Sequence, residues 1–239
     1  IRGTVLDENE QPVAGVAIRF EAVDHPKQVL TDQNGMFLFS GAPPGFALME
    51  IDGKTAVPPG ADYDLPKMTF EVHNVEGIVN ELDRPIYLLR LNSGQVTDGL
   101  TDTVLTIPEL PGFELSIPKG TKVTCPDGTH SCEVSVTQVH FDQAPMAPIN
   151  GLQPRMLITI QPPGVHFDPP APLQVPNVDG FAPNKKIDMF SFDHDLETFV
   201  AIGTGTVSED GTVVRTDPGV GVVKGGWHCG GSPQGQGSS

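Results

Sequence analysis

Apolar and polar residues alternate in many short runs along this chain, and glycine and proline separate the runs. The run at residues 157–160 (LITI) predicts a strand with one buried face. Pro162, Pro163 and Gly164 end that strand, because proline donates no ladder hydrogen bond and glycine accepts the positive φ of a turn. Residues 165–175 then supply further inward apolar positions between more prolines. Strand, proline corner and strand in succession are typical of a β-sandwich.

No window of the sequence has the pattern of an amphipathic helix of three turns. With 27 Gly and 24 Pro, the chain instead favours many short strands and many turns. We therefore expect an all-β fold with two or more β-sandwich domains in series, joined by proline-rich connections. The predicted parts are a β-sandwich at residues 1–56, a linker with joining strands at 57–92, a second β-sandwich at 93–202, a terminal hairpin with an extended strand at 203–231, and a flexible tail at 232–239.

Two stretches near the start carry a family resemblance. Residues 3–18 (GTVLDENEQPVAGVAI) and 31–37 (TDQNGMF), with the Pro-Gly turn that follows, resemble the transthyretin-like module. This module occurs as the regulatory domain of carboxypeptidases and in bacterial surface proteins. The resemblance implies a β-sandwich that acts as a spacer or packing partner, and it implies little about chemistry.

Two later stretches carry a second resemblance. Residues 113–121 (FELSIPKGT) and 157–177 (LITIQPPGVHFDPPAPLQVPN) look like the ZU-type β-sandwich shared by ankyrins and netrin receptors. Residues 187–231 resemble the end of a module in very large bacterial surface and secreted proteins, often ahead of Rhs-type repeats.

Some ZU-type relatives cut their own backbone at a His-Phe-Ser site, which needs a hydroxyl nucleophile. Here the two His-Phe pairs are followed by Asp142 and Asp168, and the Phe-Ser pair is preceded by Met189. We therefore expect no self-cleavage.

The net charge of the chain restricts the classes of partner that it is expected to bind. The 14 basic and 30 acidic residues give a formal charge of −16, which repels phosphate backbones and predicts no nucleic-acid partner. No apolar run reaches the ~20 residues that a membrane-spanning helix needs, so no membrane span is expected. Weak divalent-cation binding remains compatible with this charge.

The three cysteines indicate the kind of cellular compartment in which the chain works. Cys125 and Cys132 flank the turn sequence PDGTHS, so they are able to meet across a hairpin and form a disulfide. A zinc site with His130 or His140 is the alternative, although the spacing is wrong and a fourth ligand is missing. The disulfide implies an oxidising compartment, and Cys229 is left without a partner in the sequence.

Two polar clusters are candidate metal sites. The densest contains Asp193, His194, Asp195 and Glu197, whose carboxylates and imidazole are all able to bind a metal; the alternative is a solvated turn. Calcium is a second possibility at Asp32 and Asn34, with Asp7 as a further oxygen ligand. The sequence favours the alternative, in which Asp and Asn cap their own turn, because no complete ligand loop is present. No other cofactor is predicted.

No catalytic triad, phosphate-binding loop or framed carboxylate pair is evident, so we expect no enzyme activity. The sequence favours an extracellular or cell-surface structural or adhesive module that binds protein partners or itself. A homo-oligomer or a fibre formed by strand exchange is one form of this hypothesis, with residues 219–223 as donor strand. The alternatives are a plug or spacer at the start of an Rhs-type toxin and a carbohydrate-binding module.

Overall fold

The computed structural model describes residues 1–20, 27–140, 156–193 and 198–230, and every statement below refers to them. Their regular structure consists of β-strands and one short 3₁₀ helix, η1 (Gly53–Ala56). The prediction of an all-β fold is confirmed.

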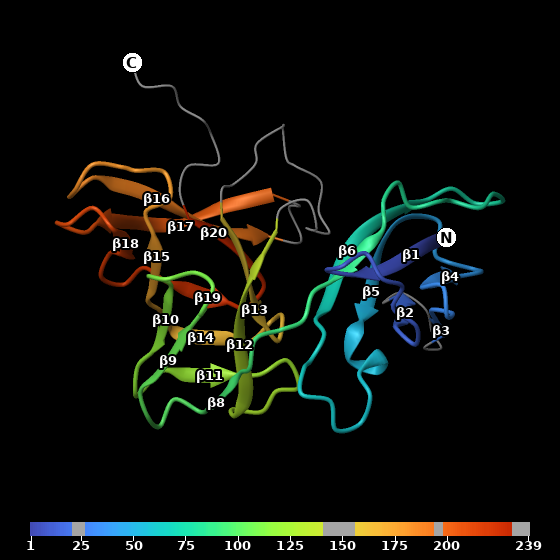
Figure 1. Cartoon of the computed structure of the whole chain (residues 1–239), viewed down its shortest axis with the longest axis horizontal. Coiled ribbons are helices and arrows are strands. Elements are labelled where there is room, and N and C mark those ends of the chain that lie inside the picture. Colours follow the sequence, from blue (N-terminus) through green and yellow to red (C-terminus); the bar gives the residue numbers. More distant parts are fainter. Residues whose placement is uncertain (21–26, 141–155, 194–197, 231–239) are drawn as a thin grey trace, which may run out of the picture. The chain divides into compact units, whose positions relative to one another are not determined.

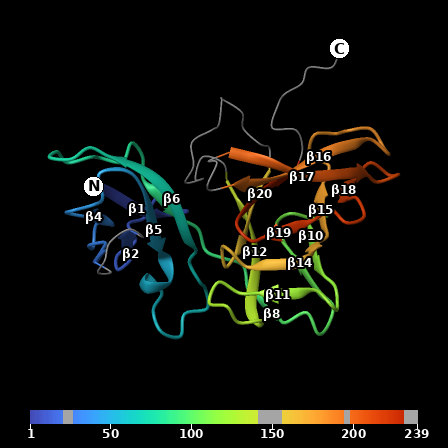
Figure 2. The same ribbon diagram turned by 180° about the vertical axis from the view of Figure 1, so that it is seen from behind.

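The chain divides into two compact units, and each is described here by itself. The first runs from Ile1 to Leu91 and is coloured blue to green in Figures 1 and 2; the second begins at Asn92. Residues 57–91, predicted as a linker with joining strands, belong to the first unit, because β6 (Lys67–Asn74) and β7 (Ile86–Leu88) pair within its sheets.

The first unit contains a four-stranded sheet in the order β3-β2-β5-β6 and a three-stranded sheet in the order β4-β1-β7. Its remaining strands are β1 (Arg2–Asp7), β2 (Ala17–Phe20), β3 (Gln28–Leu30), β4 (Met36–Leu38) and β5 (Gly45–Asp52). Strand β5 alternates as the pleat requires, with Ala47, Met49 and Ile51 buried. Phe20 and Phe39 meet edge to face in the core, with ring centroids 4.8 Å apart.

A tight turn joins β3 to β4. The Asp32 Oδ1 atom accepts hydrogen bonds from the backbone N–H groups of Asn34 (2.8 Å) and Met36 (2.9 Å), and Gly35 has a φ of 70°. A Cβ on Gly35 would lie 2.3 Å from the Val5 oxygen, so this position requires glycine. The Asp32 carboxylate therefore caps its own turn.

The second unit contains a ten-stranded sheet in the order β8-β12-β13-β20-β16-β17-β18-β15-β10-β9 and a three-stranded sheet in the order β11-β14-β19. Its strands are β8 (Gln95–Thr97), β9 (Thr103–Thr106), β10 (Glu114–Ile117), β11 (Lys122–Thr124), β12 (Cys132–Val139), β13 (Leu157–Gln161), β14 (His166–Ala171), β15 (Leu173–Pro176), β16 (Lys186–Asp193), β17 (Thr198–Val207), β18 (Val213–Thr216), β19 (Val222–Lys224) and β20 (Trp227–Gly230). The large sheet curls until it is nearly closed, so that its end strands β8 and β9 approach each other (Figure 1).

Strand β13 departs from the expectation of one buried face. All five residues of Leu157–Gln161 are buried, so neither face of β13 is open to solvent, and its two edges pair with β12 and β20. One face joins the main core through Ile158 and Ile160. Apolar and polar residues alternate along this strand, but burial does not follow the alternation, because Thr159 is polar and fully buried.

The terminal segment predicted as a separate hairpin and strand is part of this second unit. Strand β20 lies in the middle of the large sheet, between β13 and β16. Strand β19 pairs with β14, and Val222 is fully buried, so residues 219–223 already occupy a place in the fold. A role for them as a donor to another chain would require β19 to leave its sheet.

Candidate interaction surface

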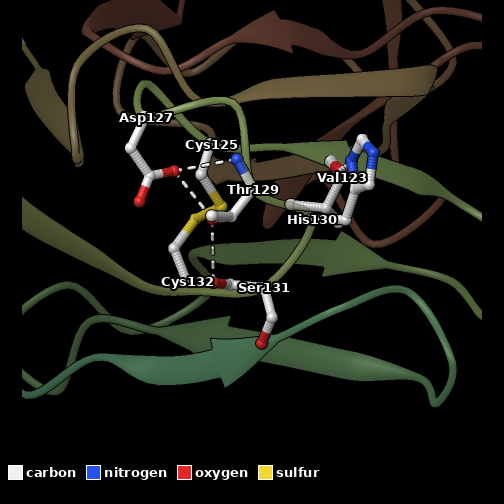
Figure 3. The surroundings of a disulfide bond; sticks show 7 residues. All are labelled: Val123, Cys125, Asp127, Thr129, His130, Ser131 and Cys132. Atoms are coloured by element: carbon white, nitrogen blue, oxygen red, sulfur yellow. Dashed lines mark hydrogen bonds between the residues drawn. A yellow bond between two sulfur atoms is a disulfide. The ribbon is translucent and has the colours of Figure 1, made fainter.

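The disulfide predicted between Cys125 and Cys132 is present. The two Cα atoms lie 6.2 Å apart, and the bond closes the loop between β11 and β12 (Figure 3). Within the loop, the backbone N–H (2.9 Å) and hydroxyl (2.7 Å) of Thr129 donate to the Asp127 Oδ1 atom, and these bonds lower the pKa of the Asp127 carboxyl. The Nδ1 atom of His130 lies 2.8 Å from the Val123 oxygen, so this imidazole holds the edge of β11.

This cross-linked loop fixes the outermost strand of the large sheet. Strand β12 begins at Cys132, and its first residues pair with β8, with Cys132 opposite Thr97 and Glu133 opposite Val96. Strand β8 has only three residues and pairs with no other strand among those described. Its position therefore depends on the disulfide-anchored start of β12.

Side chains, and no regular ladder, bridge the gap between β8 and β9. The Gln95 Nε2 atom donates to the backbone oxygen of Val104 at 3.1 Å. Beneath it, the hydroxyls of Thr103 and Thr97 lie 3.4 Å apart, and both residues are buried. We call this junction the seam. Among the described residues, the end strands β8 and β9 form no ladder with each other across it.

Three apolar side chains project outward at the seam. Val96 and Leu100 are each 71% exposed and Val104 is 47% exposed, and we call them the seam patch. Val96 and Val104 point outward because their strand neighbours Thr97 and Thr103 point inward. Exposed apolar side chains that cluster in this way are typical of sites of protein contact.

The loop that carries Leu100 is held in place by its own hydrogen bonds. Asp98 Oδ1 accepts from the Leu100 N–H at 2.8 Å, Gly99 O accepts from the Gly120 N–H at 2.8 Å, and Asp102 Oδ1 accepts from the Lys119 N–H at 2.7 Å. The exposure of Leu100 is thus a property of an ordered loop, which lowers the entropic cost of binding to it.

The predicted metal cluster falls largely outside the described residues. Asp193 is the last residue of β16 and its backbone pairs with Thr198, whereas His194, Asp195 and Glu197 lie outside the described residues. Within the ranges that the structure describes, no three His, Cys, Asp or Glu side chains are grouped so that they could hold a metal ion. At the calcium candidates, the Asp32 and Asp7 Oδ1 atoms each accept two backbone N–H bonds in their own turns.

A buried histidine lies near the end of the described chain. His228 is 1% exposed, its Nε2 atom is 3.1 Å from the Lys224 oxygen, and its Nδ1 atom has no hydrogen-bond partner among the described residues. Burial lowers its pKa to about 4, so the imidazole is neutral at pH 7. The adjacent Trp227 is also buried, at 3% exposure, and anchors β20.

The seam patch was not predicted from the sequence. In residues 103–107 (TVLTI), Val104 and Leu105 are adjacent and both apolar, so the sequence does not say which of them faces outward. The pairing with β10 settles the question, because Leu105 lies opposite Leu115 in the core and Val104 opposite the partly exposed Ser116. The available signal was the Asp98-Gly99 turn between two short strands.

Comparison with known proteins identifies no family. No family model matches the chain, and no curated protein matches it. A solved structure, that of the Bacillus anthracis TIE protein, aligns over 96% of this chain and 48% of its own length, with 11% sequence identity and a TM-score of 0.29. The chain thus spans about half the length of that protein. A TM-score this low carries no argument about fold or function. Among the described residues, no helix has the length and apolar character required to cross a membrane.

Proposed function

We propose that this chain is a non-enzymatic structural or adhesive module that works outside the cell and recognises partner proteins through the open edges of its sheets. The observation that carries the proposal is the seam patch, three exposed apolar side chains on an ordered loop and on the two end strands of the large sheet. The partner that fits is a protein segment with apolar side chains, which would cover Val96, Leu100 and Val104 on the outer surface of the seam.

The extracellular assignment is part of the same proposal. The disulfide at Cys125–Cys132 is compatible with an oxidising compartment, where such bonds persist. The transthyretin-like and ZU-type resemblances are also in keeping with a stack of passive sandwiches. Carbohydrate recognition has less support, because the chain's one Trp is buried and Tyr63 is covered by the Arg90 guanidinium, 4.3 Å from its ring.

Retention of the purified chain on the cells that produce it tests the proposal. The seam variant combines Val96→Thr, Leu100→Ser and Val104→Thr, which remove apolar surface and keep β-branched side chains in the strands. The matched control combines Val178→Thr and Val223→Thr, which alter exposed valines elsewhere in the second unit. We expect roughly tenfold weaker retention of the seam variant and unchanged retention of the control. Equal retention of the seam variant and the wild type would refute this function.

A further inference from the structure

The edge strands of the four sheets differ sharply in length. Seven of the eight have three or four residues, which is a common protection against unwanted pairing: β3, β4, β7, β8, β9, β11 and β19. The eighth, β6, has eight residues, contains neither proline nor a register shift, and pairs only with β5 among the described strands. It is the one long, regular edge that the described chain offers.

The backbone of β6 presents a row of hydrogen-bonding groups that no strand among the described residues pairs with. Its ladder with β5 starts where the Gly53 N–H donates to the Pro66 oxygen at 3.1 Å. Because antiparallel ladders alternate, Met68, Phe70 and Val72 direct their backbone groups toward β5. Lys67, Thr69, Glu71 and His73 therefore direct theirs toward the open edge.

The side chains of β6 suit a strand that is not the last of its sheet. Met68 (2% exposed) and Val72 (8% exposed) are buried on the core side, yet Phe70 between them is only partly buried. A further strand beside β6 would cover Phe70. On the outer face, Lys67 and Glu71 are four residues apart and carry opposite charges.

We propose that β6 pairs antiparallel with β6 of a second copy of this chain, with Thr69 on the two-fold axis. This register places Lys67 opposite Glu71 of the second copy, and the symmetry repeats the pair. It also sets Phe70 opposite Met68 of the second copy. The two four-stranded sheets then join into one continuous sheet.

The charged residues favour this register over the registers shifted by one or two residues. A shift that places Glu71 on the axis would oppose two carboxylates, which is unfavourable. A shift that places Phe70 on the axis keeps Lys67 diagonally next to Glu71 of the second copy. The Lys67–Glu71 contact is therefore the feature to test. In one copy, Lys67 Nζ lies 2.7 Å from Glu50 Oε2, and its side chain remains 41% exposed.

This inference rests on the proposed function, since it names one partner for a module that works through sheet edges. The measurement is sedimentation equilibrium of the full chain from micromolar to millimolar concentration, with thermal unfolding as a check on folding. Glu71→Lys and Lys67→Glu each place like charges together, so each variant alone should dimerise roughly tenfold more weakly than the wild type. An equimolar mixture of the two restores both opposite-charge contacts, and we expect it to dimerise again.

Charge reversals in the second unit, Glu109→Lys and Lys119→Glu, are the matched controls and should dimerise as the wild type does. A wild-type chain that stays monomeric overturns the inference. So does a wild-type dimer that both β6 variants reproduce, because the dimer would then use another surface. Either result leaves the seam patch untouched, so retention on cells still decides the proposed function separately.

A disulfide cross-link between the two copies tests the proposed β6 register directly. In a Cys229→Ser background, Thr69→Cys places two thiols at the axis, where directly hydrogen-bonded residues have Cα atoms about 5.5 Å apart, within reach of a disulfide. Mild oxidation should yield a covalent dimer. Glu71→Cys, which is four residues from its own copy along the ladder, should stay monomeric under the same oxidation. Equal cross-linking of the two variants contradicts the register.

Discussion

The Nε2 atom of His228 lies 3.1 Å from the backbone oxygen of Lys224, and this is the one hydrogen bond that the described residues provide to an imidazole that is 1% exposed. The carbonyl is an acceptor, so Nε2 carries the proton and Nδ1 carries a bare lone pair. Strand β20 therefore contains a histidine that folds in its neutral form, in the centre of the large sheet.

This histidine makes the stability of the second unit depend on acid. Its pKa falls from 6.5 to about 4 on folding because burial penalises the charged ring. The unfolded state binds the proton more readily, so the unfolding free energy decreases as the pH falls from 6.5 to 4, by about 3 kcal/mol at about 1.4 kcal/mol per pKa unit. In His228→Gln, which keeps a donor for Lys224, this part of the pH dependence should vanish. Urea unfolding at several pH values gives the comparison, and parallel curves for the two proteins would show that His228 is not the source.

Reduction of the Cys125–Cys132 disulfide should destabilise the second unit. The bond closes a short loop with a sequence separation of seven residues, for which chain entropy gives about 2.5 kcal/mol. Cys125→Ser with Cys132→Ser should lower the unfolding free energy by that amount, and a reducing agent should have the same effect on the wild type and none on the double variant. An unchanged urea midpoint in the double variant would mean that the loop is held by its other contacts, such as the Asp127–Thr129 hydrogen bonds.

Gly99 should tolerate no side chain. It has a φ of 73°, and a Cβ there would lie 1.8 Å from the backbone oxygen of Thr121. Gly120 is the matched control, because its φ is 95° but a Cβ would meet nothing within 4 Å. We expect Gly120→Ala to cost about 1 kcal/mol through backbone strain alone. Gly99→Ala should cost more than 2 kcal/mol and weaken retention on cells, because the loop that presents Leu100 must move. Equal costs in urea unfolding would show that the close contact is readily relieved.

Substitution of Asp32 tests whether its carboxylate caps the turn or binds calcium. Its carboxylate accepts two backbone hydrogen bonds, so Asp32→Ala should lower the stability of the first unit by about 1 kcal/mol, and by the same amount in calcium and in a chelator. A wild-type midpoint that rises with calcium, with no such rise in Asp32→Ala, would instead establish calcium binding at this turn.

The sequence predicts local features of this chain well and long-range ones poorly. Cys125 and Cys132 are separated by a turn sequence, and the Asp32 turn is complete within a few residues, so both features can be read from neighbours in the chain. The sequence predicts a linker with joining strands at residues 57–92, because the pairing of β6 with β5 across an intervening proline-rich segment cannot be read from residues 67–74. Its looser alternation reflects an edge, with Phe70 only partly covered.

The functional surface was harder to predict than the fold. The densest polar cluster, at residues 193–197, attracted a metal hypothesis because charged residues stand out in a sequence. Val96, Leu100 and Val104 are ordinary strand and turn residues until the sheet order makes β8 and β9 its two ends. His228 likewise follows Gly-Gly-Trp, and these neighbours do not show that its strand lies within the large sheet, between β13 and β16.

The central claim is that the chain works outside the cell. The location of the chain and the oxidation state of its cysteines on intact cells test this claim most directly. Intact producing cells are treated with a thiol-alkylating agent that does not cross membranes and with an added protease, and the chain is then recovered for mass spectrometry. We predict that the protease removes the chain from intact cells and that Cys125 and Cys132 are recovered as a disulfide that resists alkylation. A chain that is protected inside the cells, with both thiols reduced, would contradict an extracellular module held together by that bond.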